Sequence, residues 1–332
     1  MSDSGTENLV TVVIPARNEE SSIRACLDSV LQQDWGELEV LVVDGDSTDA
    51  TPSIVLDYQL SDSRVRLLKN PDRIIPLSLN LALAEARGRW LVRVDAHARI
   101  PSDYVRLAVT HLRTGDYGGV GGRKDGKGVT PAGRAIAAVM ASRFGVGGST
   151  YHFGSEVQET DHVPFGAYPV ATLRELDGWN EALTVNQDFE LDYRLRQRGY
   201  RILFDPALHI DWDSRQSIPA LAKQYHRYGR GKVQVALLHP RSMKPRHGAA
   251  PALVAWLAAS AAVGTRRPAV GVAMATPYLV ALAAASLPLA RELDPPARPF
   301  VAPAFVAMHV GWGVGFWEGV AGALWGRLAS RD

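Results

Sequence analysis

The sequence has 332 residues, and its 36 lysines and arginines nearly balance its 35 aspartates and glutamates. A net charge of +1 excludes the broad positive surface by which proteins bind nucleic acids. The single cysteine, Cys26, excludes an intramolecular disulfide and any metal site built from several cysteines. It lies on the apolar face of a predicted helix, so we expect it to pack in the core.

Strands and helices alternate through the first hundred residues. Apolar, β-branched runs predict strands at 10–15, 38–44, 65–69 and 90–95, and helical patterns fill the intervals between them. The third helix is expected to begin at Pro76 and to close at Gly88. Continuous apolar strands that alternate with helices predict an α/β fold, with a mainly parallel sheet covered by helices on both faces.

Polar residues follow three of these strands. They occupy positions 15–19, Asp44 and Asp95, and ligands of parallel sheets bind at the carboxyl ends of the strands. We therefore expect these residues to meet at one edge of the sheet, which we call the rim. The rim lacks both the G-x-G-x-x-G and the G-x-x-x-x-G-K-[ST] phosphate loops, which disfavours a dinucleotide fold of the oxidoreductase type.

A nucleotide held without a glycine loop usually has its phosphate charge met by a divalent cation. Asp95 and His97 could bind one, and a carboxylate with an imidazole suits Mn²⁺ better than Mg²⁺. The triplet D-x-H is weak by itself, and its place after the fourth strand gives it value. His209 and His226 are isolated, so we expect them to be packed or hydrogen-bonded and not to bind a metal.

A second group of acids occurs in the segment NQDFELDYRL, at 186–195. Asp188 or Asn186 could cap the helix that begins there. Asp188 could instead be a general base close to the rim. The sequence leaves both interpretations open, as it does for residues 129–154, which could form a core helix or a helix at the membrane surface.

The end of the chain is apolar. Runs at 249–264, 269–290 and 300–325 contain few charges, and the 22 uncharged residues of the second would span about 33 Å as a helix. We predict a membrane-embedded region of about three helices over 249–326, with buried helices of a soluble protein as the alternative. The basic stretch HPRSMKPRHG before it is typical of the cytoplasmic side, which would place residues 1–240 in the cytoplasm at the inner (plasma) membrane. The polar, acidic first ten residues predict no secretory signal.

Five motifs in order, TVVIPARNEE, VLVVDGDSTDAT, VRVDAHARI, NQDFELDYRL and AKQYHRYGRGK, resemble the family 2 glycosyltransferases. The resemblance covers roughly residues 9–235 and is strongest to the branch that includes the succinoglycan glucosyltransferase ExoA. It implies a GT-A nucleotide-sugar-binding fold and an inverting hexosyltransferase. The donor would be a nucleotide-diphosphate sugar, with UDP-sugars favoured. A divalent cation (Mn²⁺ or Mg²⁺) would take part, and the acceptor would be lipid-linked or a saccharide in polysaccharide or glycolipid assembly.

The resemblance also implies roles for individual residues. The donor nucleotide would be contacted by Pro15, Arg17, Glu19, Asp44 and Asp95. Asp95 and His97 would bind the metal, Asp188 would be the catalytic base, and Asp49 would cap a helix. Gln224, Arg227 and Tyr228 would serve the acceptor and diphosphate, and residues 164–168 (PFGAY) would form a wall of the acceptor pocket.

Three departures and two alternatives accompany this interpretation. Gln187 stands where the broad family usually has Glu, and His97 occupies the last position of the family's D-x-D metal motif. Tyr228 stands where the family has Trp, so processive synthesis is not inferred. A catalytically silent nucleotide-sugar-binding membrane scaffold is one alternative, although it would not need Asp95, Asp188 and Arg227 together. A nucleotidyltransferase is another, but it would need a glycine-rich basic loop that PARNEESS does not provide.

Overall fold

The computed structural model describes residues 7–329, so the first six residues of the polar N-terminal stretch lie outside the described chain. The described residues form two compact units. The first contains residues 7–125 and 153–212, and the second contains 126–152 and 213–329. The units therefore interleave along the chain, and the boundary expected near residue 240 falls within the second.

Within the described residues, the first unit is built on a nine-stranded sheet of order β3-β2-β1-β4-β8-β6-β9-β5, with β7 paired to β9. The strands are β1 (Val10–Ala16), β2 (Leu38–Asp44), β3 (Val65–Lys69), β4 (Trp90–Arg93), β5 (Ala98–Arg99), β6 (Tyr117–Lys127), β7 (Gln158–Glu159), β8 (Ala167–Pro169) and β9 (Arg201–Asp213). Strands β3, β2, β1 and β4 are parallel. Beyond β4, the pairs β4–β8, β6–β8, β5–β9 and β7–β9 are antiparallel, so the sheet is mixed.

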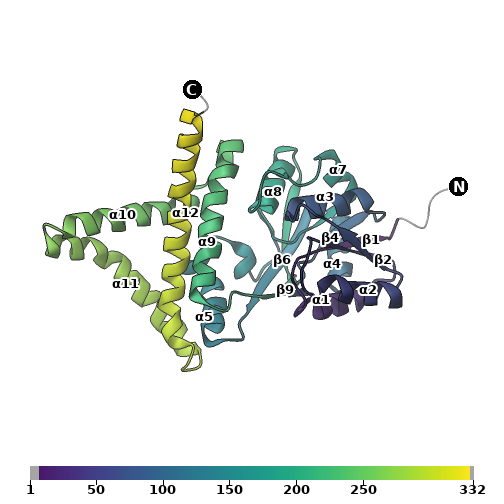
Figure 1. Ribbon diagram of the computed structural model, residues 1–332, viewed down its shortest axis with the longest axis horizontal. Helices are drawn as coiled ribbons and strands as arrows, with labels where there is room; N and C mark the ends of the chain where they lie inside the picture. The colour runs from purple at the N-terminus through teal and green to yellow at the C-terminus, as the bar shows by residue number, and fades with distance from the viewer. Residues whose placement is uncertain (1–6, 330–332) are drawn as a thin grey trace. The chain divides into compact units, whose positions relative to one another are not determined.

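Helices cover both faces of this sheet (Figure 1). One face carries α3 (Ile75–Glu85), α7 (Val170–Glu175) and α8 (Gln187–Gln197), and the other carries α1 (Ile23–Leu31), α2 (Thr51–Ser61) and α4 (Tyr104–Leu112). All residues of β1 and β2 are buried, as their continuous apolar patterns predict. Cys26 is fully buried on α1, which confirms the core role. Burial also raises the pKa of its thiol.

The prediction that Gly88 closes the third helix is wrong. Helix α3 ends at Glu85, and its C-cap residue Ala86 is already extended. Gly88 instead lets the chain pass close to β1, because a Cβ atom at this position would lie 2.7 Å from the backbone nitrogen of Thr11. The Gly88 N–H donates a hydrogen bond to Thr11 Oγ1 at 3.0 Å.

The second unit is helical. Its helices are α5 (Pro131–Met140), α6 (Arg143–Val146), α9 (Ile218–Leu238), α10 (Ala249–Gly264), α11 (Pro268–Glu292) and α12 (Val301–Ala329). Helix α5 buries Ala135, Ile136 and Val139, which supports the core interpretation of that segment. Three described stretches are long and apolar enough to cross a membrane, namely Pro245–Gly264, Pro268–Glu292 and Arg298–Trp325.

Candidate active site

The loops that follow β1 and β2 are joined by hydrogen bonds. Asn18 takes a left-handed backbone conformation, with φ of 56°, and its N–H donates to Ser47 Oγ at 2.9 Å. The Thr48 N–H donates back to Asn18 Oδ1 at 2.8 Å. Asp49 Oδ1 accepts the N–H of Thr51, the first residue of helix α2, at 3.0 Å, although the N-cap residue itself is Ala50. These bonds fix the two loops side by side at the rim.

Asp44 lies at the end of β2, opposite Ala16 of β1, and its side chain is buried. Its Oδ2 accepts the Ser47 N–H at 3.2 Å, but its Oδ1 is buried with no hydrogen-bond partner among the described residues. A buried carboxylate oxygen without a donor is unfavourable. Asp44 therefore presents an acceptor suited to an N–H group of a bound ligand.

The other predicted contacts of the nucleotide lie around the end of β1. Pro15 is buried within the strand, and Arg17 is exposed just beyond it. The Arg17 side chain runs beside Gly45, because a Cβ atom added at Gly45 would lie 3.4 Å from the Cβ atom of Arg17. The donor-binding residues predicted from the β1 and β2 ends thus lie on neighbouring loops of one unit.

Arg93 joins two carboxylates that are far apart in the sequence. It ends β4 and is 2% exposed. Its Nε and Nη2 donate to Asp95 Oδ1 at 3.0 and 2.9 Å, and its Nη1 donates to Asp188 Oδ1 at 2.5 Å. Burial disfavours the charged guanidinium, but Asp188 and Asp95 outweigh it and raise the pKa of Arg93, so the group stays cationic. The predicted base and the predicted metal ligand thus meet at one buried cation.

Sequence reasoning missed Arg93. Its signal was an arginine in the apolar strand WLVRV, where a buried charge requires partners. The same contacts bear on the two interpretations of Asp188, which lies in the first turn of α8, and its role as a base stays a prediction. Its Oδ1 accepts from Arg93 and from Trp179 Nε1, the latter at 3.2 Å, and Asn186 at the N-cap makes no capping bond through its side chain. The contacts of Asp188 are therefore those of a residue directed to the rim.

His97 belongs to the same group of side chains. Its Nδ1 lies 3.0 Å from Glu19 Oε1, so the tautomer that donates to Glu19 leaves Nε2 free to bind a metal. Its ring lies 5.7 Å from that of Trp212, and Lys124 Nζ lies 3.5 Å from the Trp212 ring centroid. The aromatic ring of Phe165 then lies under both Lys124 and Arg93. A continuous set of contacts thus connects His97 to Arg93 and its two carboxylates.

The side chains of Asp95 and His97 are compatible with a divalent cation for which the protein supplies only some of the ligands. Arg93 donates to Asp95 Oδ1, so Asp95 Oδ2 can bind a metal, and the hydrogen bond to Glu19 orients the His97 ring. No group of three histidine, cysteine or acidic side chains within residues 7–329 could hold a metal alone. Oxygen atoms of a bound substrate would have to complete the coordination. His226 is paired with Glu318, Nε2 to Oε2, at 2.7 Å, as expected of a structural histidine.

The PFGAY segment lies beside α8. Phe165 has a φ of 54°, and Tyr168 is buried on β8. The buried Asp192 of α8 accepts hydrogen bonds from the Val163 N–H at 3.0 Å and from Tyr168 Oη at 3.3 Å, and it pairs with His162 Nδ1 at 2.7 Å. Burial raises the pKa of Asp192 although His162 opposes the shift. These bonds hold the segment in place, and its predicted role as an acceptor wall stays a prediction.

Gln224, Arg227 and Tyr228 belong to the second unit, on α9. Gln224 is buried, donates to Tyr228 Oη at 2.7 Å and accepts from Arg215 Nε at 3.3 Å. Arg227 is exposed. The motif is thus ordered by an i,i+4 pair, and its predicted role toward acceptor and diphosphate stays a prediction.

Comparison with known proteins decides the family. The model of glycosyl transferase family 2 matches residues 11–168, and that of glycosyl transferase family group 2 matches residues 90–290. The succinoglycan biosynthesis protein ExoA of Rhizobium meliloti is 33% identical over 96% of each chain. The chain belongs to glycosyltransferase family 2. Within this family it lies in the ExoA branch.

Other family 2 relatives and solved structures agree. A dolichyl N-acetyl-α-D-glucosaminyl phosphate 3-β-D-2,3-diacetamido-2,3-dideoxy-β-D-glucuronosyltransferase of Methanococcus voltae is 26% identical over 68% of this chain and 73% of its own. The mannosyltransferase PcManGT from Pyrobaculum calidifontis, solved with GDP-Man and Mn²⁺, superposes with a TM-score of 0.61 at 24% identity. That likeness covers 95% of this chain and 87% of the other. The mixed sheet and its flanking helices therefore form a GT-A fold, as the sequence resemblance implied.

Proposed function

We propose that this family 2 glycosyltransferase is an inverting hexosyltransferase. It would move a sugar from a nucleotide-diphosphate donor to a lipid-linked or saccharide acceptor in polysaccharide or glycolipid assembly. One observation carries the proposal: the carboxylates of Asp95 and Asp188 share the buried guanidinium of Arg93. The shared guanidinium supports a base and a diphosphate-facing carboxylate acting side by side.

Donor binding would use the β1 and β2 ends. The partnerless Oδ1 of Asp44 would accept an N–H of the nucleobase, and the N3–H of uracil in a UDP-sugar is a group of this kind. Arg17 is exposed beside Gly45 and is free to approach the ligand. Pro15 and Glu19 would shape the same end of the site, with Glu19 held to His97.

Asp95 and His97 are the residues that would hold a divalent cation, Mn²⁺ or Mg²⁺. Its chemistry would be to neutralise the negative charge on the diphosphate. The Glu19–His97 hydrogen bond supports this, because a second carboxylate that fixes the imidazole is usual behind metal-binding histidines. Arg93 keeps Asp95 in position through its two hydrogen bonds.

Asp188 would be the general base. Arg93 and Trp179 hold its Oδ1, which leaves Oδ2 to take the proton of the acceptor hydroxyl. The acceptor oxygen forms a bond to the anomeric carbon of the sugar while the bond from that carbon to the diphosphate oxygen breaks. The diphosphate leaves on the opposite face with the electron pair of the broken bond. One displacement with one base inverts the anomeric carbon, so an α-linked donor would give a β-glycoside.

We also propose that the protein acts at the inner membrane with its catalytic part in the cytoplasm. The three apolar stretches and the basic residues that precede them support this placement. A silent nucleotide-sugar-binding scaffold is the alternative. The buried cluster of Arg93, Asp95 and Asp188 argues against it, because a binding scaffold does not need a positioned base.

The test is a screen of the full-length protein against several nucleotide sugars, with and without Mn²⁺ or Mg²⁺. We expect one donor to release nucleoside diphosphate in a cation-dependent way, and transfer to begin when a lipid-linked or saccharide acceptor is added. Binding of a donor without release or transfer under any condition would favour the scaffold.

A further inference from the structure

The three apolar stretches of the second unit differ in how they pack. In the most apolar part of Pro245–Gly264 and of Pro268–Glu292, 11% of the residues are buried. In the most apolar part of Arg298–Trp325, 39% are buried. Helices α10 and α11 make a hairpin that two side-chain-to-backbone hydrogen bonds join. Ser260 Oγ donates to the Gly271 carbonyl at 2.6 Å, and Trp256 Nε1 donates to the Met274 carbonyl at 2.8 Å. Such internal pairing is what the hydrocarbon core of a bilayer requires.

Helix α12, in contrast, packs closely against α9. The two helices run in the same direction, with Gly311 beside Ala222 and Gly315 beside His226. A Cβ added at Gly315 would lie 2.0 Å from the His226 carbonyl oxygen, so the two backbones are in contact. Glu318 of α12 is also paired with His226 and with Arg230 of α9. Any membrane depth reached by this part of α12 is therefore reached by α9.

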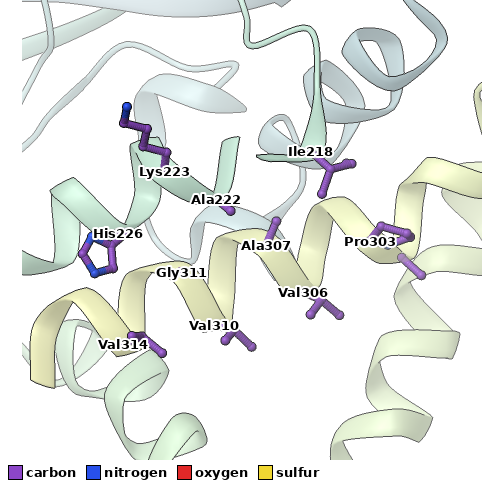
Figure 2. Close-up of a pocket in the computed structure, with 11 residues that line it drawn as sticks. Ile218, Ala222, Lys223, His226, Pro303, Val306, Ala307, Val310, Gly311 and Val314 are labelled. Atoms are coloured by element: carbon purple, nitrogen blue, oxygen red, sulfur yellow. The ribbon is translucent and has the colours of Figure 1, made fainter. Parts of the chain in front are cut away.

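Helix α9 is too polar to be at that depth. Lys223, Arg227 and Arg230 are exposed on it, and it contains no acidic residue. Figure 2 shows Lys223 and His226 above the middle of α12, where they line a groove of about 910 Å³ together with Ala307 and Gly311. If α12 crossed the bilayer, these cations would lie within the hydrocarbon region, where charged side chains are strongly disfavoured.

The lengths of the helices give an independent argument. Helix α10 begins against the middle of α12, because Trp317 Nε1 donates to the Pro251 carbonyl at 2.9 Å, and α11 leads back to the start of α12 at Val301. At 1.5 Å per residue, α10 is about 24 Å long, α11 about 37 Å, and the part of α12 between Val301 and Trp317 about 24 Å. A triangle with these sides makes α10 roughly perpendicular to α12, and Figure 1 shows α10 and α11 extending away from α12. The two helices cannot both run along the membrane normal.

Helix α12 also has the side chains of a helix that lies at an interface. Val306, Val314, Trp317 and Leu324 are exposed on it at helical spacing, and Figure 2 shows Val306, Val310 and Val314 projecting from one side of α12. An apolar stripe with tryptophan beside a helix of exposed cations matches the boundary between acyl chains and anionic headgroups.

We propose that the α10–α11 hairpin is the element inserted into the bilayer and that α12 lies with α9 along the membrane surface on the side where the chain enters. The C-terminal end of α12 is then on the same side as the residues that precede α10. This arrangement places six basic residues on that side, Arg241, Lys244, Arg246, Arg291, Arg298 and Arg327, and only Arg266 and Arg267 at the far end. With three spans, the same eight residues would divide five to three, a weaker bias than cytoplasmic segments usually show.

Cysteine labelling of the full-length protein in sealed membrane vesicles tests the topology. The one native thiol, Cys26, is fully buried, so the background is low. Ser61→Cys, at the exposed end of α2, marks the side of the catalytic unit, and Ser330→Cys marks the residue after α12. We expect a membrane-impermeant maleimide to label both from the same side. Labelling of the two sites from opposite sides would overturn the proposal.

A depth scan decides the orientation of α12 separately. Nitroxides are attached at Val306→Cys, Val314→Cys and Leu324→Cys, which cover about 27 Å of helix. We expect all three to lie at one shallow depth and Leu279→Cys of α11 to lie deep. A depth difference of about 15 Å between positions 314 and 324 would show that α12 crosses the bilayer. Neither result depends on sugar transfer, so failure of this proposal would leave the proposed function standing.

Discussion

The rim of the first unit and the α10–α11 hairpin of the second are opposites in burial. At the rim, Arg93 is buried with its charge, and the two carboxylates it pairs are only 15% and 13% exposed. In the hairpin, apolar side chains such as Val280 and Leu287 are 61% and 59% exposed. Each pattern reverses the ordinary rule that charges are exposed and large apolar groups are buried. The reversals mark the two surfaces that we propose meet partners, a charged nucleotide sugar and a lipid bilayer.

The largest effect is expected at the base. Asp188→Asn keeps the shape of the side chain but cannot accept the proton of the acceptor hydroxyl, so the transfer rate should fall by about 10²- to 10⁴-fold. Donor affinity should stay close to that of the wild type. Rates and donor binding are measured on the same preparations. Transfer at a near wild-type rate would remove Asp188 from the mechanism.

The buried guanidinium is the next test of the comparison. Arg93→Met leaves two partly buried carboxylates without their cation, and we expect it to lower the free energy of unfolding by about 2–4 kcal/mol. Arg93→Lys keeps the charge but not the forked donor geometry, so its free energy of unfolding should lie between those of Arg93→Met and the wild type. Chemical denaturation measures both, with Arg24→Met on the exposed face of α1 as the control that changes little. Equal stability of Arg93→Met and the control would show that the cluster does not hold the rim together.

A smaller effect is expected at Asp44. Asp44→Asn replaces one carboxylate oxygen by an NH₂ group, so the buried acceptor for the nucleobase is weakened. Donor affinity should fall by about 10- to 100-fold while the transfer rate at saturating donor changes little. Asp46→Asn is the matched control, since Asp46 is half-exposed and pairs with Arg73. Equal loss in the two variants would argue against recognition by Asp44.

The smallest effect is expected at Glu39, which should influence stability at low pH and not catalysis. Glu39, near the start of β2, is buried, which disfavours its charge, but Thr11 Oγ1 at 2.6 Å and two Arg87 donors at 2.7 Å outweigh this and lower its pKa below the ordinary 4.5. Its contribution to stability is therefore complete above pH 4.5 and is lost as the pH falls below that value. Glu39→Gln should flatten this part of the pH–stability curve. The exposed Glu37→Gln should not, and identical curves for both would contradict the assignment.

The sequence predicted the parallel half of the sheet because its central strands β1 and β2 are fully buried and carry continuous apolar patterns. It also brought Asp44, Asp95 and Asp188 to attention through strand ends and family motifs. It did not predict the antiparallel half, where β5, β7 and β8 are two or three residues long and leave no periodic signal. Arg93 was missed because its partner Asp188 is close only in three dimensions.

The membrane region shows the same limit. Composition identified three apolar stretches of sufficient length, and the structure contains all three as helices. Composition does not predict how α12 is oriented in the membrane. That orientation depends here on the glycines that bring α12 against the cationic α9. The pairing of two helices, and so the orientation that we propose, follows only from contacts between Gly315 and His226 and their neighbours.

The most direct measurement is the anomeric configuration of the product, read from the proton coupling at C1 by NMR after transfer from an α-linked nucleotide sugar. A single displacement assisted by one carboxylate, held by Arg93, predicts a β-glycoside. An α-glycoside would show that the configuration is retained, and it would contradict the account of the rim as a site for one inverting displacement.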